Sequence, residues 1–170
     1  GNPLYAWKKH AETGYAWWIS RLRALGEMFD ILRIDHFIGF ANYYAIPAEE
    51  LTARGGKYEL GPGRRLFTRI KKALPELNIV AEDLGVVSAR VRKLLNWCGY
   101  PGMKVMQFAY DGQNSNDLPE YHVPNCVVYT GTHDNNTTLG WWRDATDETK
   151  ARAREKLGMA PDGEDILPHI

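Results

Sequence analysis

The sequence predicts an α/β protein, built as part of a (β/α)8 TIM barrel with roughly four parallel strands and outer helices. The first observation is alternation: amphipathic helical segments and short apolar runs follow one another, a pattern typical of parallel strands covered by helices. The second is that three apolar runs each lead into an acidic residue. The third is length, since 170 residues fall short of the roughly 250 of a complete barrel. We therefore expect half a barrel.

In the first part of the chain, apolar residues recur at steps of three and four, which predicts amphipathic helices. These helices are expected over residues 15–29 and 64–74. Each leads into a strand, and the two strands end at Asp35 and Glu82. Residues 1–14 are expected to be mostly irregular. Residues 40–63 have no sustained period but several tyrosines, which indicates a structured, functional loop.

The second part of the chain continues the alternation. Ser88 is a helix N-cap residue and Gly99 follows the apolar positions of that helix, so a helix is expected between them. Two strands are expected over residues 103–108 and 126–130, with a polar loop over residues 111–124. Thr146 is expected to cap a last helix over residues 147–157, with acidic residues in its first turn.

Composition excludes several classes of protein. Twenty-one basic and twenty-one acidic residues cancel, so neither nucleic acid nor an anionic membrane is an expected partner. No apolar run is long enough to cross a bilayer. Cys98 and Cys126 show no CxxC spacing and are expected to be reduced and buried, which favours a cytoplasmic location. The chain begins at Gly1 without an initiator methionine, so we expect a piece of a longer protein.

Carboxylates at strand ends suggest the chemistry. Residues i and i+2 of a strand point the same way, so Arg33 and Asp35 are expected to share a face at one strand terminus. Glu82 and Asp134 follow two other apolar runs. Glycosidic bond chemistry needs one carboxylate as nucleophile and one carboxylic acid to protonate the leaving oxygen. Retaining enzymes hold the two about 5–5.5 Å apart, which neighbouring strands about 4.8 Å apart can supply.

Five motifs carry a resemblance to a known family, in the family's order and across nearly the whole chain. They are Gly1-Asn2-Pro3-Leu4-Tyr5, Arg33-Ile34-Asp35-His36-Phe37, Ala81-Glu82-Asp83-Leu84-Gly85, Pro101-Gly102-Met103-Lys104-Val105 and Tyr129-Thr130-Gly131-Thr132-His133-Asp134-Asn135. With these motifs the chain closely resembles the amylomaltases, or 4-alpha-glucanotransferases (disproportionating enzymes), of glycoside hydrolase family 77 in the alpha-amylase clan. The resemblance implies a fragment of the catalytic barrel domain, residues 1–170, covering approximately its middle-to-late strands.

The resemblance also implies roles for individual residues. Asp35 would be the nucleophile that forms a covalent glycosyl ester, Glu82 the general acid/base, and Asp134 the transition-state stabiliser. The substrate-binding residues implied are Arg33, His133, Tyr5 and Asn135. The implied reaction is the retaining transfer of an alpha-1,4-glucan segment to the 4-hydroxyl of a maltooligosaccharide, alpha-glucan or glucose acceptor, with no cofactor and no metal.

Two positions depart from the family pattern. Ile38 stands where an arginine is common, and Asn136 where an aspartate often follows His133-Asp134-Asn135. Because neither belongs to the three acids, the departures are expected to affect acceptor contacts or to be lineage variation.

Other interpretations stay open from the sequence. The acids could be helix caps or turn residues, and Asp35, His36, His133 and Asp134 could be metal ligands, although no His-x-His or His-x-x-x-His pair appears. A hydrolase of the same clan and a non-catalytic polysaccharide-binding fragment are the alternative functions. An incomplete barrel exposes strand edges, so we expect the isolated 170 residues to be inactive and to self-associate.

Overall fold

The computed structural model describes residues 2–112 and 116–170. Gly1 of the first motif and residues 113–115 of the expected polar loop lie outside the described residues. The chain forms two compact units, which divide between Gly102 and Met103. Each unit is described by itself.

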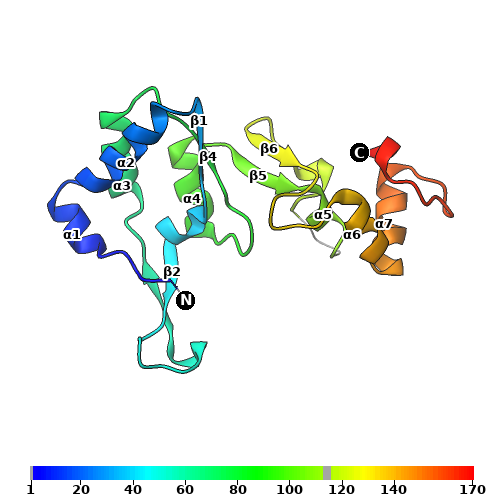
Figure 1. Ribbon diagram of the computed structural model, residues 1–170, viewed down its shortest axis with the longest axis horizontal. Coiled ribbons are helices and arrows are strands. Elements are labelled where there is room, and N and C mark those ends of the chain that lie inside the picture. The colour runs from blue at the N-terminus through cyan, green and yellow to red at the C-terminus, as the bar shows by residue number, and fades with distance from the viewer. Residues whose placement is uncertain (1, 113–115) are drawn as a thin grey trace. The chain divides into compact units, whose positions relative to one another are not determined.

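In the first unit, two parallel strands lie beside helices (Figure 1). Its elements are α1 (Trp7–Glu12), α2 (Ala16–Gly26), β1 (Ile31–Ile34), β2 (Asn42–Ala45), β3 (Lys57–Leu60), α3 (Arg64–Ala73), β4 (Asn78–Ala81) and α4 (Ala89–Cys98), with short 3-10 turns at Phe37–Phe40 and Ala53–Gly55. Strands β1 and β4 pair in parallel, and Ile34 lies opposite Ala81. The residues that follow this last pair are Asp35 and Glu82, so both acids leave the sheet at the same end.

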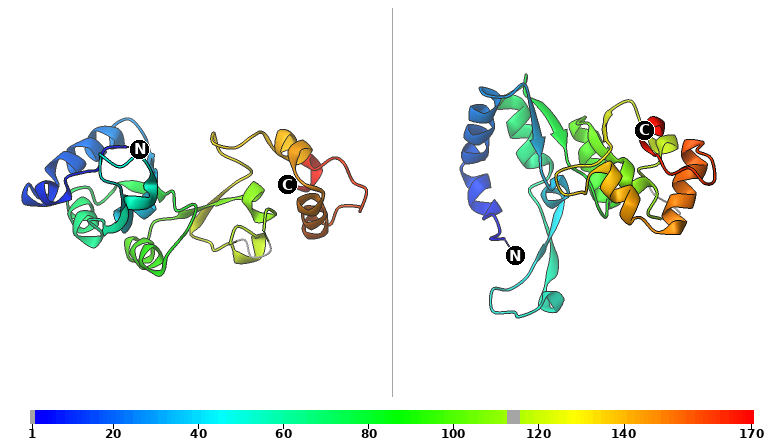
Figure 2. Two further views of the ribbon diagram at one scale, coloured as in Figure 1. Left: turned by 90° about the horizontal axis from the view of Figure 1, so that it is seen from below. Right: turned by 45° about the vertical axis from the view of Figure 1, so that its right-hand side comes forward.

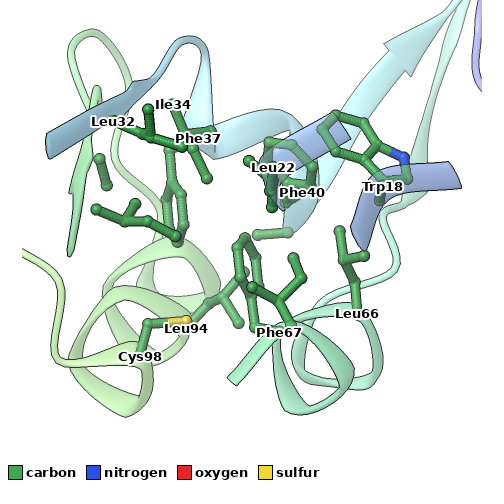
Figure 3. Close-up of a cluster of buried hydrophobic side chains, with 14 of the residues drawn as sticks. Trp18, Leu22, Leu32, Ile34, Phe37, Phe40, Leu66, Phe67, Leu94 and Cys98 are labelled. Carbon is green, nitrogen blue, oxygen red and sulfur yellow. The ribbon is translucent and has the colours of Figure 1, made fainter. Parts of the chain in front are cut away.

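One apolar core joins the two parallel strands to helices α2, α3 and α4 (Figure 3). Leu32 and Ile34 point from β1 into this core, because alternate strand residues face the same side. The rings of Phe37 and Phe67, both fully buried, lie 5.3 Å apart between centroids. The turn after Asp35 is therefore anchored in the core by Phe37, one residue beyond His36.

Cys98 ends α4 inside this core, and its burial predicts a loss of stability in alkali. Burial raises the pKa of the thiol from its ordinary value of 9.0 to about 12, with smaller opposing effects from Lys71 and Arg64. Between these two pKa values the folded state holds a proton that the unfolded state has lost. The free energy of unfolding should therefore be unaffected by this thiol below pH 9 and fall as the pH rises towards 12, by about 3 kcal/mol at pH 11.

Urea unfolding of the chain at pH 8 and pH 11 measures this fall. A Cys98→Ala variant should show a smaller fall. Tyr43, Tyr100 and Tyr110, whose pKa burial also raises, should contribute to the fall that remains. Val91→Ala offers the control, because Val91 is buried in the same helix and carries no ionisable group, so this variant should keep the wild-type pH dependence. Equal dependence in Cys98→Ala and wild type would contradict the assignment to Cys98.

Residues 40–63 are expected to form a structured loop without a sustained period, and residues 42–60 of this segment form a β-hairpin. Strands β2 and β3 are antiparallel, with Asn42 opposite Leu60 and Ala45 opposite Lys57. The hairpin leaves the β1–β4 sheet as a long arm (Figure 1 and Figure 2). Both strands have only four residues and mixed exposure, so they lack the alternating apolar pattern that identifies a strand in a sequence.

The second unit contains the remaining strands and a helical end. Its elements are β5 (Gly102–Val105, which begins on the last residue of the first unit), α5 (Met106–Ala109), β6 (Cys126–Tyr129), α6 (Thr138–Asp144) and α7 (Asp147–Leu157), with 3-10 turns at Pro119–Tyr121 and Leu167–His169. Strand β5 pairs with β6. Tyr110, Trp142, Ala153 and Ile166 are central members of its core.

Most expected elements are present, but one strand boundary needs correction and two short helices are additional to the expected elements. Residues 1–14 contain helix α1, which buries no residue and so carries no apolar period. The strand expected over residues 103–108 ends at Val105 and turns into α5. Helix α6 was not expected, because its seven residues span barely two turns.

Two further observations complete the fold. Among the described residues, no helix is long and apolar enough to cross a membrane. Both cysteines are free thiols; Cys98 is buried as expected, whereas Cys126 is only half-buried.

Candidate active site

Arg33 and Asp35 meet at the end of β1, as their spacing predicts. The Arg33 Nη2 donates to Asp35 Oδ1 over 2.7 Å. The side chain of Asp35 is 78% exposed and that of Arg33 is 31% exposed. An exposed carboxylate held on one oxygen by a guanidinium has its second oxygen available for a ligand.

Glu82 is tied by its carboxyl group to the backbone that follows Asp35. Its Oε2 accepts the main-chain N–H of His36 over 2.7 Å, and its Oε1 accepts that of Leu84 over 2.9 Å. Its own main chain bonds to the same segment, because the Glu82 N–H donates to Ile34 O and the Phe37 N–H donates to Glu82 O. The Glu82 carboxyl group is therefore held beside the residue next to Asp35, and each oxygen keeps a further lone pair for a proton or a ligand.

His36 takes a backbone conformation that non-glycine residues seldom adopt. Its φ of +48° lies in the left-handed region. The ring also packs over Gly39, where a Cβ atom would lie 2.9 Å from His36 Cδ2. This sharp turn aims the His36 N–H at the Glu82 carboxyl group, so the strained residue directly follows Asp35 and is bonded to Glu82.

A cavity of about 380 Å³ opens on Asp35, a size typical of small-ligand sites. Tyr5, Arg33, Asp35 and His36 all line it. Tyr5 is 41% exposed, and its ring lies 5.1 Å from that of Trp18 between centroids. The structure thus brings together Tyr5, Arg33 and Asp35 around one cavity.

The other three predicted residues, His133, Asp134 and Asn135, lie in the second unit on a compact turn after β6. Asn135 Oδ1 accepts both the N–H of Thr132, over 2.8 Å, and its hydroxyl, over 2.9 Å. Asn135 thus shapes the turn with its side-chain oxygen. His133 Nε2 lies 3.4 Å from Asp134 Oδ1, and both side chains are more than 70% exposed.

A second cavity of about 440 Å³ lies beside this turn and is lined by residues that the sequence did not single out. Gln107 and Phe108 line it together with Asp134 and Asn135. The sequence predicts one strand over residues 103–108, and this expectation gives no reason to place Gln107 or Phe108 at a site, because it omits the helix that begins at Met106. Among residues 2–112 and 116–170, no group of three or more His, Cys, Asp or Glu side chains is placed to hold a metal ion.

The two departures from the family pattern have visible surroundings. Asn136 Nδ2 donates to Asp144 Oδ2 over 3.2 Å, a bond that an aspartate at this position could not make without a proton. Ile38 is half-buried against the first core, where an aliphatic side chain is well accommodated. Neither residue contacts the carboxyl groups of Asp35 or Glu82 in the hydrogen bonds described above.

Comparison with known proteins gives a consistent result. The family model described as 4-alpha-glucanotransferase, glycoside hydrolase family 77, matches residues 1–167. The 4-alpha-glucanotransferase of Streptococcus pneumoniae is 50% identical over 157 residues, which are 89% of this chain and 31% of that protein. The chloroplastic/amyloplastic 4-alpha-glucanotransferase of Arabidopsis thaliana is 45% identical, covering 98% of this chain and 29% of that protein.

The solved structures agree with the sequences. The amylomaltase from Streptococcus agalactiae in complex with acarbose superposes with a TM-score of 0.88 at 42% identity, covering 96% of this chain and 33% of that chain. The chain thus spans about a third or less of the length of these relatives. The resemblance seen in the five motifs is confirmed, and so is an α/β fold with parallel strands. The chain belongs to the 4-alpha-glucanotransferase family.

Proposed function

We propose that these residues carry the catalytic acids of a retaining 4-alpha-glucanotransferase that acts on alpha-1,4-glucans. The observation that supports this most is the bond from the His36 N–H to Glu82 Oε2, because it holds the Glu82 carboxyl group against the backbone of the residue that follows Asp35. An exposed carboxylate beside a guanidinium suits a nucleophile, and a half-buried carboxyl group next to it suits an acid/base.

In the first half-reaction, an oxygen of Asp35 attacks the anomeric carbon of the bound glucan. The bond from that carbon to the glycosidic oxygen breaks, and Glu82 gives its proton to the departing oxygen. The products are a glycosyl ester on Asp35, a shortened glucan with a free 4-hydroxyl, and an ionised Glu82. Arg33 holds the other oxygen of Asp35 and so orients the attacking one.

In the second half-reaction, the 4-hydroxyl of an acceptor glucan loses its proton to Glu82 and attacks the same anomeric carbon. The ester bond breaks, Asp35 is regenerated, and inversion twice gives retention. Asp134 would offset the positive charge that develops at the anomeric carbon in both steps. His133 would donate to hydroxyl groups of the sugar, and Tyr5 would contact it from the wall of the cavity.

We further infer that the strands belong to one partial TIM barrel. Beside β4, the Ala81 N–H donates to Pro101 O over 2.8 Å, directly before β5 begins. This bond continues the parallel pairing from β1 through β4 to the start of the next strand. The TM-score of 0.88 against an amylomaltase supports the same arrangement.

Product analysis with maltotriose tests the proposed activity. The measurement uses a full-length form, which is a polypeptide that contains residues 1–170 and has the length of the relatives described above. Transfer predicts glucose together with a ladder of maltooligosaccharides longer than the substrate. Glucose and maltose without longer products would identify a hydrolase, and an unchanged substrate would leave only glucan binding. Either result would overturn the proposed activity.

The 170 residues alone should be inactive and self-associate. Within the described residues, β1 pairs with β4 on one edge and with no strand on the other. Next to this open edge, Met28, Phe29 and Ile31 are 64%, 57% and 61% exposed. Unpaired strand edges flanked by apolar side chains promote association. Size-exclusion chromatography with light scattering should show species larger than 19.4 kDa; a monomer with full transferase activity would contradict this prediction.

The cellular location also stays a prediction. A cytoplasmic location is expected from the reduced thiols, whereas the plant relatives from Arabidopsis thaliana and Solanum tuberosum carry chloroplastic/amyloplastic names.

A further inference from the structure

Gln107 is a buried polar side chain with a specific partner near the proposed site. It is 3% exposed and lies in α5, two residues after the end of β5. Its side-chain Nε2 donates to the main-chain oxygen of Asn136 over 2.9 Å. Because a carbonyl oxygen can only accept, the amide nitrogen must face it, and the orientation of the side chain is fixed by its partner.

The same amide touches the other end of the turn that carries Asp134. A Cβ atom at Gly131 would lie 2.6 Å from Gln107 Nε2 and 3.2 Å from its Cδ. Because glycine has no Cβ atom, the backbone at residue 131 can approach the Gln107 amide closely. Gln107 thus contacts residues 131 and 136, which bracket His133, Asp134 and Asn135.

The turn of residues 131–136 is held by hydrogen bonds among its own residues and is exposed to solvent. Asn135 Oδ1 accepts from Thr132 twice, and the Asp134 N–H donates to Thr132 Oγ1 over 3.3 Å. These bonds fix the shape of the turn and do not tie it to the body of the unit. Asp134 itself is 73% exposed, so its position depends on how the ends of the turn are held.

We propose that Gln107 is a positioning residue, whose amide anchors the turn of residues 131–136 and so places the carboxylate of Asp134. The proposal rests on the proposed function for its catalytic meaning, because Asp134 acts there as the stabiliser of the transition state. A group that acts in the transition state loses effect when displaced by about 1 Å, and such displacements can cost about 100-fold in rate. Gln107 would therefore govern the rate without touching the substrate.

The first experiment compares Gln107→Met with wild type in the full-length form. Methionine keeps the length and volume of the side chain and removes the donor. We expect kcat for maltotriose transfer to fall about 10- to 100-fold while KM changes less than about 3-fold, because the interaction lost is made in the transition state. Hydrogen exchange of the backbone amides in residues 131–137 should become faster. A kcat equal to wild type would overturn the proposal.

A matched control separates positioning from loss of stability. Ala153 is fully buried in α7 of the same unit, and Ala153→Gly lowers helix stability without touching the turn. This variant should lower the melting temperature and leave kcat and the exchange of residues 131–137 unchanged. If it reproduces the kinetic effect of Gln107→Met, Gln107 acts only on stability and the proposal fails.

A double-mutant cycle tests the contact itself and covers the case in which Gln107→Met does not fold. Gly131→Ala should reduce kcat because its methyl group displaces the amide. The Gln107→Ala variant lacks the amide that this methyl group would displace. In that background Gly131→Ala should therefore reduce kcat clearly less. Additive effects would overturn the proposal. Absence of transfer in the wild type would contradict the proposed function instead, and hydrogen exchange would still decide whether Gln107 anchors the turn.

Discussion

Asp35→Asn in the full-length form is expected to reduce maltotriose transfer by about 10⁴- to 10⁶-fold, the range seen when an enzyme loses its nucleophile. The amide is nearly the same size as the carboxylate, so the cavity beside Tyr5 and Arg33 should keep its shape. The asparagine amide, however, carries no negative charge with which to attack the anomeric carbon. The measurement is the initial rate of ladder formation, with substrate binding followed separately by calorimetry.

The control for Asp35→Asn is Asp30→Asn. Asp30 is also an exposed aspartate and lies directly before β1, at the end of the strand opposite Asp35. This variant should keep the wild-type rate. A second measurement detects the covalent intermediate. When the wild type is quenched with acid during turnover of maltosyl fluoride, the peptide that contains Asp35 should carry one glycosyl group. A label on another carboxylate, or near-normal transfer by Asp35→Asn, would exclude Asp35 as the nucleophile.

Glu82→Gln is expected to reduce transfer from maltotriose by about 10²- to 10⁴-fold, the usual contribution of general acid–base catalysis. The reason is that the amide cannot give a proton to the departing sugar oxygen. With maltosyl fluoride the first half-reaction should be restored to within about 10-fold of wild type, since fluoride departs without a full proton transfer. The glycosyl ester on Asp35 should then accumulate, because no base activates the acceptor.

Azide provides the decisive readout for Glu82. As an anion it needs no general base, so it should release the accumulated ester of the Glu82→Gln variant as a glycosyl azide of retained configuration. Glu76→Gln is the matched control, because Glu76 is an exposed glutamate shortly before β4 and far along the strand from Glu82. If azide gave no rescue, or if maltosyl fluoride were as slow as maltotriose, Glu82 would not be the acid/base.

The elements with local signals could be predicted from the sequence. Helix α7 begins and ends where its caps indicate, since Thr146 Oγ1 accepts from the Thr149 N–H and Gly158 adopts the left-handed conformation. Helix α4 is bounded in the same way by Ser88 and Gly99. A helix cap depends on residues that are only three or four positions apart, so it can be predicted from the local sequence.

Elements that depend on partners far along the chain could not be predicted in this way. The hairpin of β2 and β3 is held by pairing and by side chains such as Tyr44, whose hydroxyl donates to the carbonyl oxygens of Ala53 and Gly56. Such bonds leave no period in the sequence. The α6 helix is likewise short, and its capping residue Thr137 lies in a run of polar residues that resembles a loop.

The same distinction applies to the candidate site, where contacts between neighbouring residues could be predicted and contacts between distant residues could not. Residue spacing was sufficient to bring Arg33 and Asp35 together, because two residues on one strand share a face. The bond between the His36 N–H and Glu82 spans 46 residues and requires the parallel pairing of β1 with β4. The contact of Gln107 with Asn136 spans 29 residues and is visible only in three dimensions.

The link between the His36 N–H and the Glu82 carboxyl group also bears on thermal motion. When the paired strands β1 and β4 fluctuate, the Glu82 carboxyl group moves together with the backbone next to Asp35, so the distance between Glu82 and that backbone should change little. The turn that carries Asp134 is exposed and is closed by hydrogen bonds among its own residues. We therefore expect the temperature and viscosity dependence of the reaction to follow the mobility of that turn, and the Glu82 carboxyl group to move as one rigid body with the backbone next to Asp35.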